Sequence, residues 1–228
     1  MAVVLLLQGD AELARTVGLS LAVSALACAC AAGLGLLGGA WLAVTRFPGH
    51  RLLVILLNTL LALPSVVVGL VVYLLLSRSG PLGSWGILFT PTAMVIAQTI
   101  LVLPIIAALA RQLVGDSLRD GGDQLRSMGA GPLTCALLML LHDRWAVVTV
   151  LLTAFGRAIA EVGAVMVVGG NIAGVTRVMT TSIALETSKG DLPLALALGL
   201  VLLAVVGLVN FGVALIQRGQ GSALAGVR

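Results

Sequence analysis

Residues 146 to 171 read "AVVTVLLTAFGRAIAEVGAVMVVGGN", and this stretch decides the class of fold. Its only charged residues are Arg157 and Glu161, and the apolar run around them is long enough to cross a bilayer, which needs about 20 residues. About 12 residues of helix separate Trp145 from Arg157, so the arginine would lie about 18 Å deep at about 1.5 Å per residue. A lone charge at that depth costs at least about 2.5–3.5 kcal/mol, which predicts that Arg157 and Glu161 pair and face a bundle interior.

The composition of the whole chain indicates a multi-pass membrane protein. The 228 residues are 60% hydrophobic and 10% charged, with a mean hydropathy of +1.16, whereas a soluble domain has about 45–50% apolar and about 25% charged residues. The net charge of +4 is explained by basic residues that flank membrane spans, because the sequence has no basic run that would indicate nucleic acid. Cys28, Cys30 and Cys135 have neither metal-ligand spacing nor a disulfide framework. We therefore expect no metal, cofactor or nucleic acid.

Five apolar stretches are long enough to span a membrane, and they predict an all-α bundle that forms a single domain over residues 1–228. Residues 1–14 are too short to span and are expected to lie at the interface or to begin the first helix. Pro64 and Pro104 lie inside spans, where neighbouring helices must replace the lost backbone hydrogen bonds. Gly35 and Gly39 form a GxxxG pattern, which indicates close helix packing. The predicted spans are Thr16–Val44, Leu52–Leu76, Thr92–Val114, Ala146–Val168 and Leu192–Ile216.

The basic residues favour one orientation of these spans. Five spans place the termini on opposite sides, and cytoplasmic segments carry the excess of Lys and Arg. With a cytoplasmic C-terminus, the outside segments hold only Arg15, Arg78, Arg177 and Lys189, and the inside segments hold Arg46, Arg51, Arg111, Arg119, Arg126, Arg144, Arg218 and Arg228. The distribution predicts an outside N-terminus, a cytoplasmic segment 115–145 and an outside segment 169–191.

Segment 115–145 is the long polar interruption on the predicted cytoplasmic side. Its charges from Asp116 to Arg126 recur every three or four positions, as on the wet face of a helix, and "GAGP" at 129–132 separates them from the apolar "LTCALLMLL". An ordinary amphipathic connection would give this pattern too. The segment also resembles the EAA loop of the permeases of binding-protein-dependent ABC importers, although the two alanines and the final proline of that pattern are absent. The matching positions, which the resemblance assigns to coupling with an ATPase, are Asp123, Gln124, Leu125, Gly129, Met139 and Leu141.

Two further stretches carry the same resemblance. "RAIAEVGA" at 157–164 is similar to the Arg-Ala-x-x-Glu-Phe-Gly-Ala pattern of molybdate and sulfate permeases, and together with the following "TRVMTTSIALETSKGD" it looks like the tungstate permeases. "NTLLALPSVVVGLVVYLLLS" at 58–77 is similar to the second span of the same group. The resemblance implies the permease fold of type I ABC importers, with about five spans, in a bacterial or archaeal cell membrane.

The resemblance also implies the partners and the mechanism. Two copies of the permease would form the translocation path, each coupling loop would dock on a separate ATP-binding subunit, and an outside binding protein would deliver the oxyanion. The sequence itself supports the need for a separate ATP-binding subunit. A Walker A sequence needs Gly-Lys followed by Ser or Thr, and the single lysine, Lys189, is followed by Gly190. We therefore expect a transport subunit rather than an enzyme, and no residue is assigned a catalytic role.

Arg157 and Glu161 allow two interpretations. On one continuous helix they would be four residues apart with the basic residue first, an order that contributes little to helix stability. The pair either faces the dimer axis, where it lets a dianion pass without trapping it, or locks this span to a neighbour. The further candidates for the translocation path, whose polar members could instead bond between helices, are Pro64, Ser65, Gln98, Thr99 and Asn171.

Other functions remain as alternatives. Tungstate is the favoured substrate, and molybdate and sulfate are alternatives because all three are tetrahedral dianions. A secondary transporter driven by an ion gradient would be expected to have internal repeats or paired broken helices, and neither is evident in the sequence. An intramembrane protease would need a nucleophile with its base, or paired aspartates, inside a span, and no span contains an aspartate.

Overall fold

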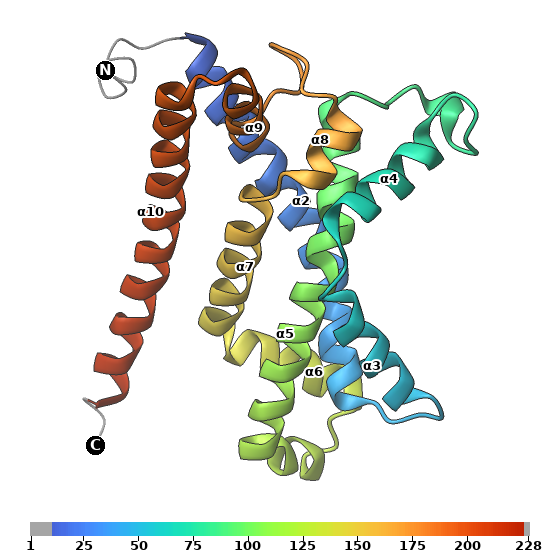
Figure 1. Cartoon of the computed structure of the whole chain (residues 1–228). Coiled ribbons are helices and arrows are strands. Elements are labelled where there is room, and N and C mark those ends of the chain that lie inside the picture. Colours follow the sequence, from blue (N-terminus) through green and yellow to red (C-terminus); the bar gives the residue numbers. More distant parts are fainter. Residues whose placement is uncertain (1–10, 226–228) are drawn as a thin grey trace.

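The computed structural model describes residues 11–225, without the side chains of residues 11, 120, 123, 126, 213 and 215–225. This part of the chain is helical and contains no β-strand, which confirms the all-α prediction. Its helices are α2 (Ala11–Val44), α3 (His50–Leu60), α4 (Ser65–Leu76), the short 3-10 helix η1 (Gly83–Trp85), α5 (Pro91–Ser127), α6 (Pro132–His142), α7 (Arg144–Ile159), α8 (Gly163–Gly169), α9 (Met179–Lys189) and α10 (Leu192–Ala225) (Figure 1).

Helices α2 and α5 cross closely and form the centre of the bundle (Figure 1). The GxxxG glycines lie at this crossing, because a Cβ on Gly39 would be 2.2 Å from the Ala107 carbonyl oxygen and one on Gly35 would be 2.9 Å from Ile106 Cγ2. The close packing predicted from these glycines is confirmed. Helix α5 stays continuous at Pro104, which is fully buried in the bundle, so neighbouring helices enclose the point where the proline removes a hydrogen bond.

The predicted second span, Leu52–Leu76, is not one straight helix. It consists of α3 and α4, which meet at an angle of 99° across residues 61–64. Pro64 lies at this break and is exposed, so no neighbouring helix holds the chain straight as happens at Pro104. The described part of the chain thus has three helices that are long and apolar enough to cross a membrane, and up to five spans if each bent pair counts as one.

The predicted fourth span, Ala146–Val168, is also interrupted. Helix α7 ends at Ile159, residues 160–162 are not helical, and α8 begins at Gly163. The structure therefore contains paired broken helices that the sequence did not reveal. Arg157 lies in the last turn of α7 and Glu161 lies in the break, so the prediction of one continuous helix through both residues is wrong.

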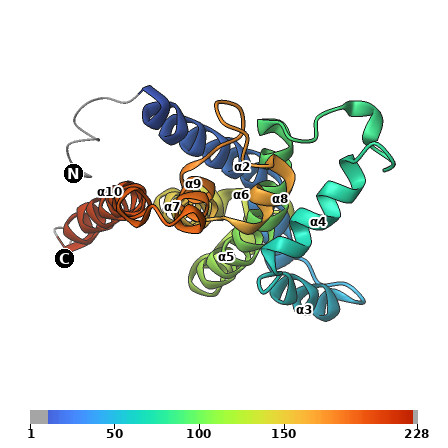
Figure 2. The ribbon, with the colours of Figure 1, turned by 45° about the horizontal axis from the view of Figure 1, so that its top comes forward.

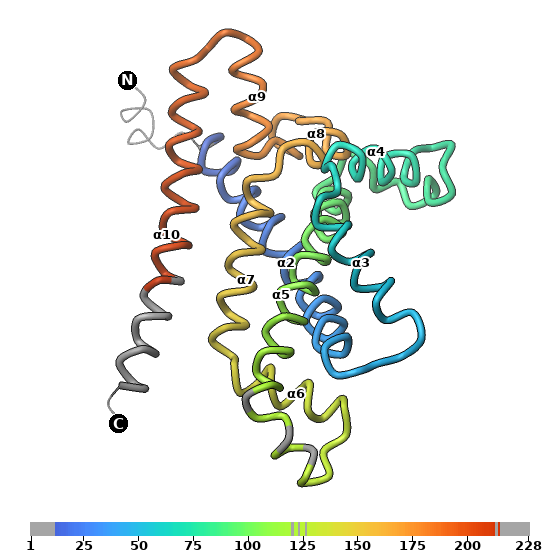
Figure 3. The backbone as a smooth tube through the Cα atoms, turned by 60° about the horizontal axis from the view of Figure 1, so that its bottom comes forward, coloured from blue at the N-terminus to red at the C-terminus, as the bar shows by residue number. Residues whose placement is uncertain are grey.

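The end of the bundle formed by α5 and α6 has the predicted helix–turn–helix. Helix α5 continues 13 residues beyond the predicted span end at Val114, from Gly115 to Ser127, and residues 128–131 turn the chain into α6. An 80° bend at Asp143 then leads into α7, and the Ser117 hydroxyl donates a hydrogen bond to the Asp143 carboxylate, which joins α5 to this bend. Figure 3 shows α6 and the end of α5 together at one extremity of the molecule.

The described helices differ in how much of their surface they bury. Helix α3 has no buried side chain, and α10 exposes a row of large apolar residues that includes Leu196, Leu200 and Leu203. Figure 2 shows α10 on one flank of the bundle and α3 and α4 on the other. Because lipid or a second membrane subunit can cover such faces, their exposure agrees with a multi-pass membrane protein. Helix α2 starts at the end where α10 also starts, and α10 finishes at the opposite end (Figure 1).

Candidate functional site

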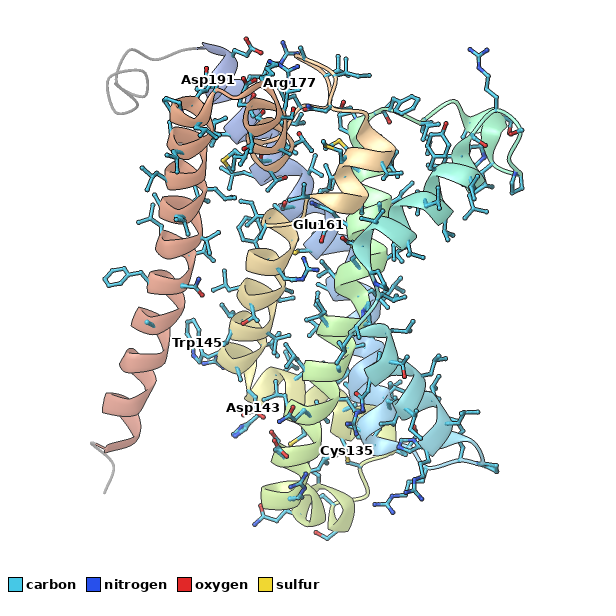
Figure 4. All side chains as sticks on the ribbon, viewed as in Figure 1. Cys135, Asp143, Trp145, Glu161, Arg177 and Asp191 are labelled. Atoms are coloured by element: carbon cyan, nitrogen blue, oxygen red, sulfur yellow. The ribbon has the colours of Figure 1, made fainter. Side chains whose placement is uncertain are left out.

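The two helix breaks lie against each other. A Cβ on Gly163 would be 2.7 Å from Ser65 Oγ, and a Cβ on Gly69 would be 2.8 Å from the Cα atom of Ala164. Only glycine permits this approach, so the first turns of α4 and α8 are in backbone contact. The starts of both helices thus meet part-way along the bundle, beside Glu161 (Figure 4).

Arg157 and Glu161 form an ion pair across the end of α7. Arg157 Nη1 lies 2.8 Å from Glu161 Oε2, which confirms the predicted pairing. The two side chains differ in exposure, because 49% of the arginine is accessible and only 4% of the glutamate is. One end of the pair is therefore enclosed, and the guanidinium reaches the surface of the subunit.

Glu161 connects three helices. Its Oε1 accepts a hydrogen bond from the Ala164 amide of α8 at 3.3 Å. Its carbonyl oxygen accepts from the Thr180 hydroxyl of α9 at 2.8 Å, and its amide donates to the Ala158 carbonyl of α7 at 3.1 Å. Glu161 therefore satisfies backbone groups that the break in the helix leaves free.

A small polar cavity borders this junction. It has a volume of about 10 Å³, which is room for about one water molecule, and its polar lining comprises Ser20, Ser24, Gln98, Glu161 and Thr180. Gln98 Nε2 donates to the Ala158 carbonyl at 3.0 Å, while Gln98 Oε1 is buried without a hydrogen-bond partner in the described chain. The surroundings of the buried Glu161 are thus polar rather than apolar on the side of this cavity.

Sequence reasoning missed the hydroxyl groups of this junction. Thr180, Ser20 and Ser24 are all at most 5% exposed, and the Ser20 hydroxyl accepts from the Met179 amide at 2.8 Å. The spacing of Ser20 and Ser24, four residues apart in an apolar span, was the available signal, since it places both on one helix face.

The other predicted path residues are distributed over several places. Pro64 and Ser65 lie at the junction of the breaks, and Gln98 lines the small cavity. Thr99 points toward α2 instead, because its hydroxyl lies 2.7 Å from the Val95 carbonyl and 3.4 Å from the Ala27 carbonyl. Asn171 lies beyond the far end of α8 in a left-handed conformation with φ of 49°. The structure thus brings Pro64, Ser65 and Gln98 together with Arg157 and Glu161, and places Thr99 and Asn171 elsewhere.

The predicted coupling residues lie in the α5–α6 turn and on the two helices that it connects. Gly129 has φ of +83°, a conformation that favours glycine, and the Ala130 amide donates to the Leu125 carbonyl across the turn. Gln124 and Leu125 lie on α5 and face Met139 of α6 across a cavity of about 400 Å³. Leu141 is exposed, and the side chain of Asp123 lies outside the described residues.

Exposed apolar side chains continue from this turn along α6. Met128 lies in the turn, and Leu133, Leu137 and Leu141 recur every four residues on one face of α6. We name these four residues the coupling surface, after the role that the sequence resemblance predicts for this segment.

Curated proteins of several organisms resemble the chain, whereas no family model matches it. The chain is 43% identical over 210 residues to the tungstate uptake system permease protein TupB of Peptoclostridium acidaminophilum, which covers 90% of each chain. It is also 43% identical over 210 residues to a probable anion ABC transporter permease protein of Haloferax volcanii, which covers 89% of this chain and 90% of the relative. The sulfate transport system permease protein CysW of Escherichia coli is 37% identical over 149 residues, which covers 60% of this chain and 50% of the relative.

The two relatives at 43% identity cover about nine-tenths of this chain. Both relatives at 43% identity are named as permease proteins, which agrees with the expectation of a transport subunit. With identities of 43% across about nine-tenths of its length, the chain belongs to the family of ABC-transporter permeases that includes the tungstate uptake permeases.

Proposed function

We propose that this protein is the membrane-spanning subunit of an importer for a tetrahedral oxyanion, with tungstate as the substrate. The observation that carries the proposal is the 43% identity to a tungstate uptake permease over 90% of both chains. A second tungstate uptake permease, from Campylobacter jejuni, is 41% identical over 73% of this chain. The sulfate permeases of Synechocystis and Escherichia coli are less similar, at 32% and 37% identity, so sulfate and the related tetrahedral dianion molybdate are the alternatives.

The Arg157–Glu161 pair supports a role in the translocation path. Because Glu161 is enclosed and Arg157 reaches the surface, the outward part of the pair is the guanidinium, whose remaining N–H groups can donate to an oxyanion. The adjacent carboxylate cancels most of the charge at longer range, so a passing dianion is attracted without being held tightly. In this proposal, a second copy of the permease covers the face that carries Arg157 and Pro64, and the path runs between the copies.

The coupling surface supports docking of a separate ATP-binding subunit. Its apolar side chains extend from the turn at Gly129 along α6, and the bend at Asp143 connects this end of the bundle to α7. A push on α6 would therefore be transmitted along α7 to Arg157 and the junction. We propose that the coupling surface is cytoplasmic, that the N-terminus is outside, and that an outside binding protein delivers the anion.

Reconstitution tests the substrate and the energy source together. The permease would be placed in proteoliposomes with the ATPase and the binding protein from the same source, and uptake of tungstate, molybdate and sulfate would be measured with ATP enclosed. We expect tungstate uptake that stops when the Walker lysine of the ATPase is replaced. Uptake that persists with the inactive ATPase and follows an ion gradient would establish a secondary transporter, and preferential uptake of molybdate or sulfate would replace tungstate as the substrate.

Cysteine labelling tests the orientation. In a background without Cys28, Cys30 and Cys135, single cysteines would be placed at Ser188 after α9 and at Met128 in the coupling surface, both of which are exposed. An impermeant reagent added outside should label Ser188→Cys and leave Met128→Cys unlabelled. The reverse result would contradict the cytoplasmic position of the coupling surface.

A further inference from the structure

A basic cavity lies at the end of the bundle that carries the coupling surface, away from Arg157 and Glu161. It has a volume of about 650 Å³ and is enclosed by the last residues of α2, the connection 45–49, the first turn of α3 and the middle of α5. Its charged lining consists of Arg46, Arg51, Arg111 and Arg119, and no aspartate or glutamate lines it among the described residues. We call this space the basic cavity.

Three of the four arginines have charges that no described group balances. Arg119 pairs with Asp116 at 3.0 Å, whereas the side chains of Arg46, Arg51 and Arg111 have neither an ion pair nor a hydrogen bond within the described residues. Arg111 is partly buried, and its Nε is enclosed without a hydrogen-bond partner. A buried charged donor without a partner is costly, so Arg111 indicates a ligand with anionic oxygen atoms. Arg46 and Arg51 are exposed and line the same cavity, where they add positive charge.

Aromatic residues place the basic cavity at the level of lipid headgroups. Trp41 near the end of α2 stacks on Phe47 with ring centroids 5.4 Å apart, and Phe47 meets the edge of the His50 ring at 5.5 Å. Trp41 is exposed, as is Trp145 at the same end of the bundle (Figure 4). Tryptophan side chains concentrate where the hydrocarbon layer ends and the headgroups begin.

An apolar groove continues from the basic cavity toward the middle of the bundle. It has a volume of about 170 Å³, shares Leu42 with the cavity, and lies between α2, α3 and α5. It extends along α3 from Leu53 to Leu60, which is about 10 Å at about 1.5 Å per residue. No charged residue lines it, and we call it the leucine groove after its residues Leu42, Leu53, Leu56, Leu57 and Leu60.

We propose that the basic cavity and the leucine groove together bind one anionic phospholipid. Arg46, Arg51 and Arg111 hold the phosphate of the headgroup, and an acyl chain lies in the leucine groove. The charge of the cavity complements an anionic headgroup, and the groove complements hydrocarbon, whereas a free oxyanion would use only the cavity. Since α3 has no buried side chain of its own, the lipid would fasten α3 to α2 and α5 beside the broken α3–α4 span.

Native mass spectrometry of the full-length permease in detergent tests the proposal. Phosphatidylglycerol and phosphatidylcholine with identical acyl chains would be added in equal amounts, and retention of each would be compared. We expect retention of phosphatidylglycerol, with a loss of about fivefold for each arginine removed in Arg111→Gln and Arg46→Gln. Arg144→Gln is the matched control, because Arg144 lies at the same end of the bundle, is exposed and does not line the cavity. Arg111→Lys keeps the charge and should retain more lipid than Arg111→Gln.

Two further measurements test the role of the leucine groove and competition by free anions. Leu57→Trp should fill the leucine groove and lower retention of phosphatidylglycerol while the arginines remain intact. Inorganic phosphate or tungstate at millimolar concentration should not displace the lipid. Equal retention of the two lipids, an equal loss in Arg144→Gln, or displacement by the free anion with no effect of Leu57→Trp would overturn the proposal. Monodisperse elution of each variant shows that a loss of lipid does not arise from unfolding.

Discussion

The α2–α5 crossing and the α4–α8 contact both depend on glycine, yet they produce opposite kinds of structure. At the first, Gly35 and Gly39 bring together two continuous helices whose backbone groups are bonded within each helix, apart from the bond that Pro104 removes. At the second, Gly69 and Gly163 bring together two helix starts whose backbone groups need outside partners. Small residues thus allow close approach in both places, and the continuity of the helices decides whether the contact is apolar or polar.

The polar contact is the one where charge is found. Inside a membrane an unsatisfied backbone group costs several kcal/mol, so a broken helix is tolerated only where side chains replace the missing bonds. Glu161 and Thr180 provide these bonds at the α7–α8 break. The glutamate is therefore structural on its buried side, and this leaves Arg157 available on the other side. The lock and the path, which sequence reasoning treated as alternatives, are compatible in one pair.

The largest effect should come from overfilling the α2–α5 crossing. Gly39→Ala would place a Cβ 2.2 Å from the Ala107 carbonyl oxygen, so one backbone must move, at a cost of about 3 kcal/mol in the free energy of unfolding. Thermal unfolding in detergent measures this loss. Gly38→Ala is the control, because nothing lies within 4 Å of its added Cβ, and equal destabilisation by both changes would refute the crossing as the centre of the fold.

The next effect separates the two roles of the ion pair. Arg157→Ala leaves the buried Glu161 carboxylate without its charged partner, and Glu161→Ala removes the bonds at the break, so each should cost about 1.5–3 kcal/mol. The double variant should regain part of the free energy of unfolding that each single variant loses, because neither charge is left unpaired. Its anion uptake should stay low, because the charges that line the proposed path are gone. Unfolding and uptake would be measured on all three variants. Normal uptake by a stable double variant would leave the pair as packing alone.

A smaller and more local effect is expected at the coupling turn. Gly129→Val forces a branched residue into φ of +83°, at a cost of about 1–2 kcal/mol that falls on the turn rather than on the bundle. We expect weaker copurification with the ATPase subunit and unchanged insertion into the membrane. Gly131→Val is the control, since Gly131 has φ of −69° and open space around it. If both variants bind the ATPase like the native chain, the coupling surface is not the docking site.

The smallest effect is expected from the single hydrogen bond between Thr180 and Glu161 at the α7–α8 break. Thr180→Val keeps the size of the side chain and removes the hydroxyl that donates to the Glu161 carbonyl, for an expected loss of about 1 kcal/mol. Thr187→Val removes an exposed hydroxyl that bonds within α9 and should have a negligible effect in the same unfolding experiment. If Thr180→Val and Thr187→Val have the same free energy of unfolding, the hydrogen bond from Thr180 does not stabilise the break.

Sequence reasoning was most accurate where a feature depends on neighbouring residues. The helical class, the long spans, the Gly35–Gly39 contact, the turn at Gly129 and the pairing of Arg157 with Glu161 all follow from composition or from spacing within one turn. It was least accurate for the continuity of the second and fourth spans. Pro64 and Pro104 both lie within apolar stretches that are long enough to span a membrane. In the structure, the helix with the buried Pro104 continues and the chain at the exposed Pro64 bends.

The sequence by itself determined that this protein is an all-helical membrane protein with a charged pair inside an apolar stretch, because hydrophobicity and charge are properties of the residues themselves. The tertiary structure alone decided what surrounds that pair. The hydrogen bonds at and around the pair join residues that are 19 positions apart for Thr180 and Glu161, 60 for Gln98 and Ala158, and 159 for Met179 and Ser20. Hydrogen bonds over such separations depend on how helices are placed in space, and no local pattern in the chain encodes that placement.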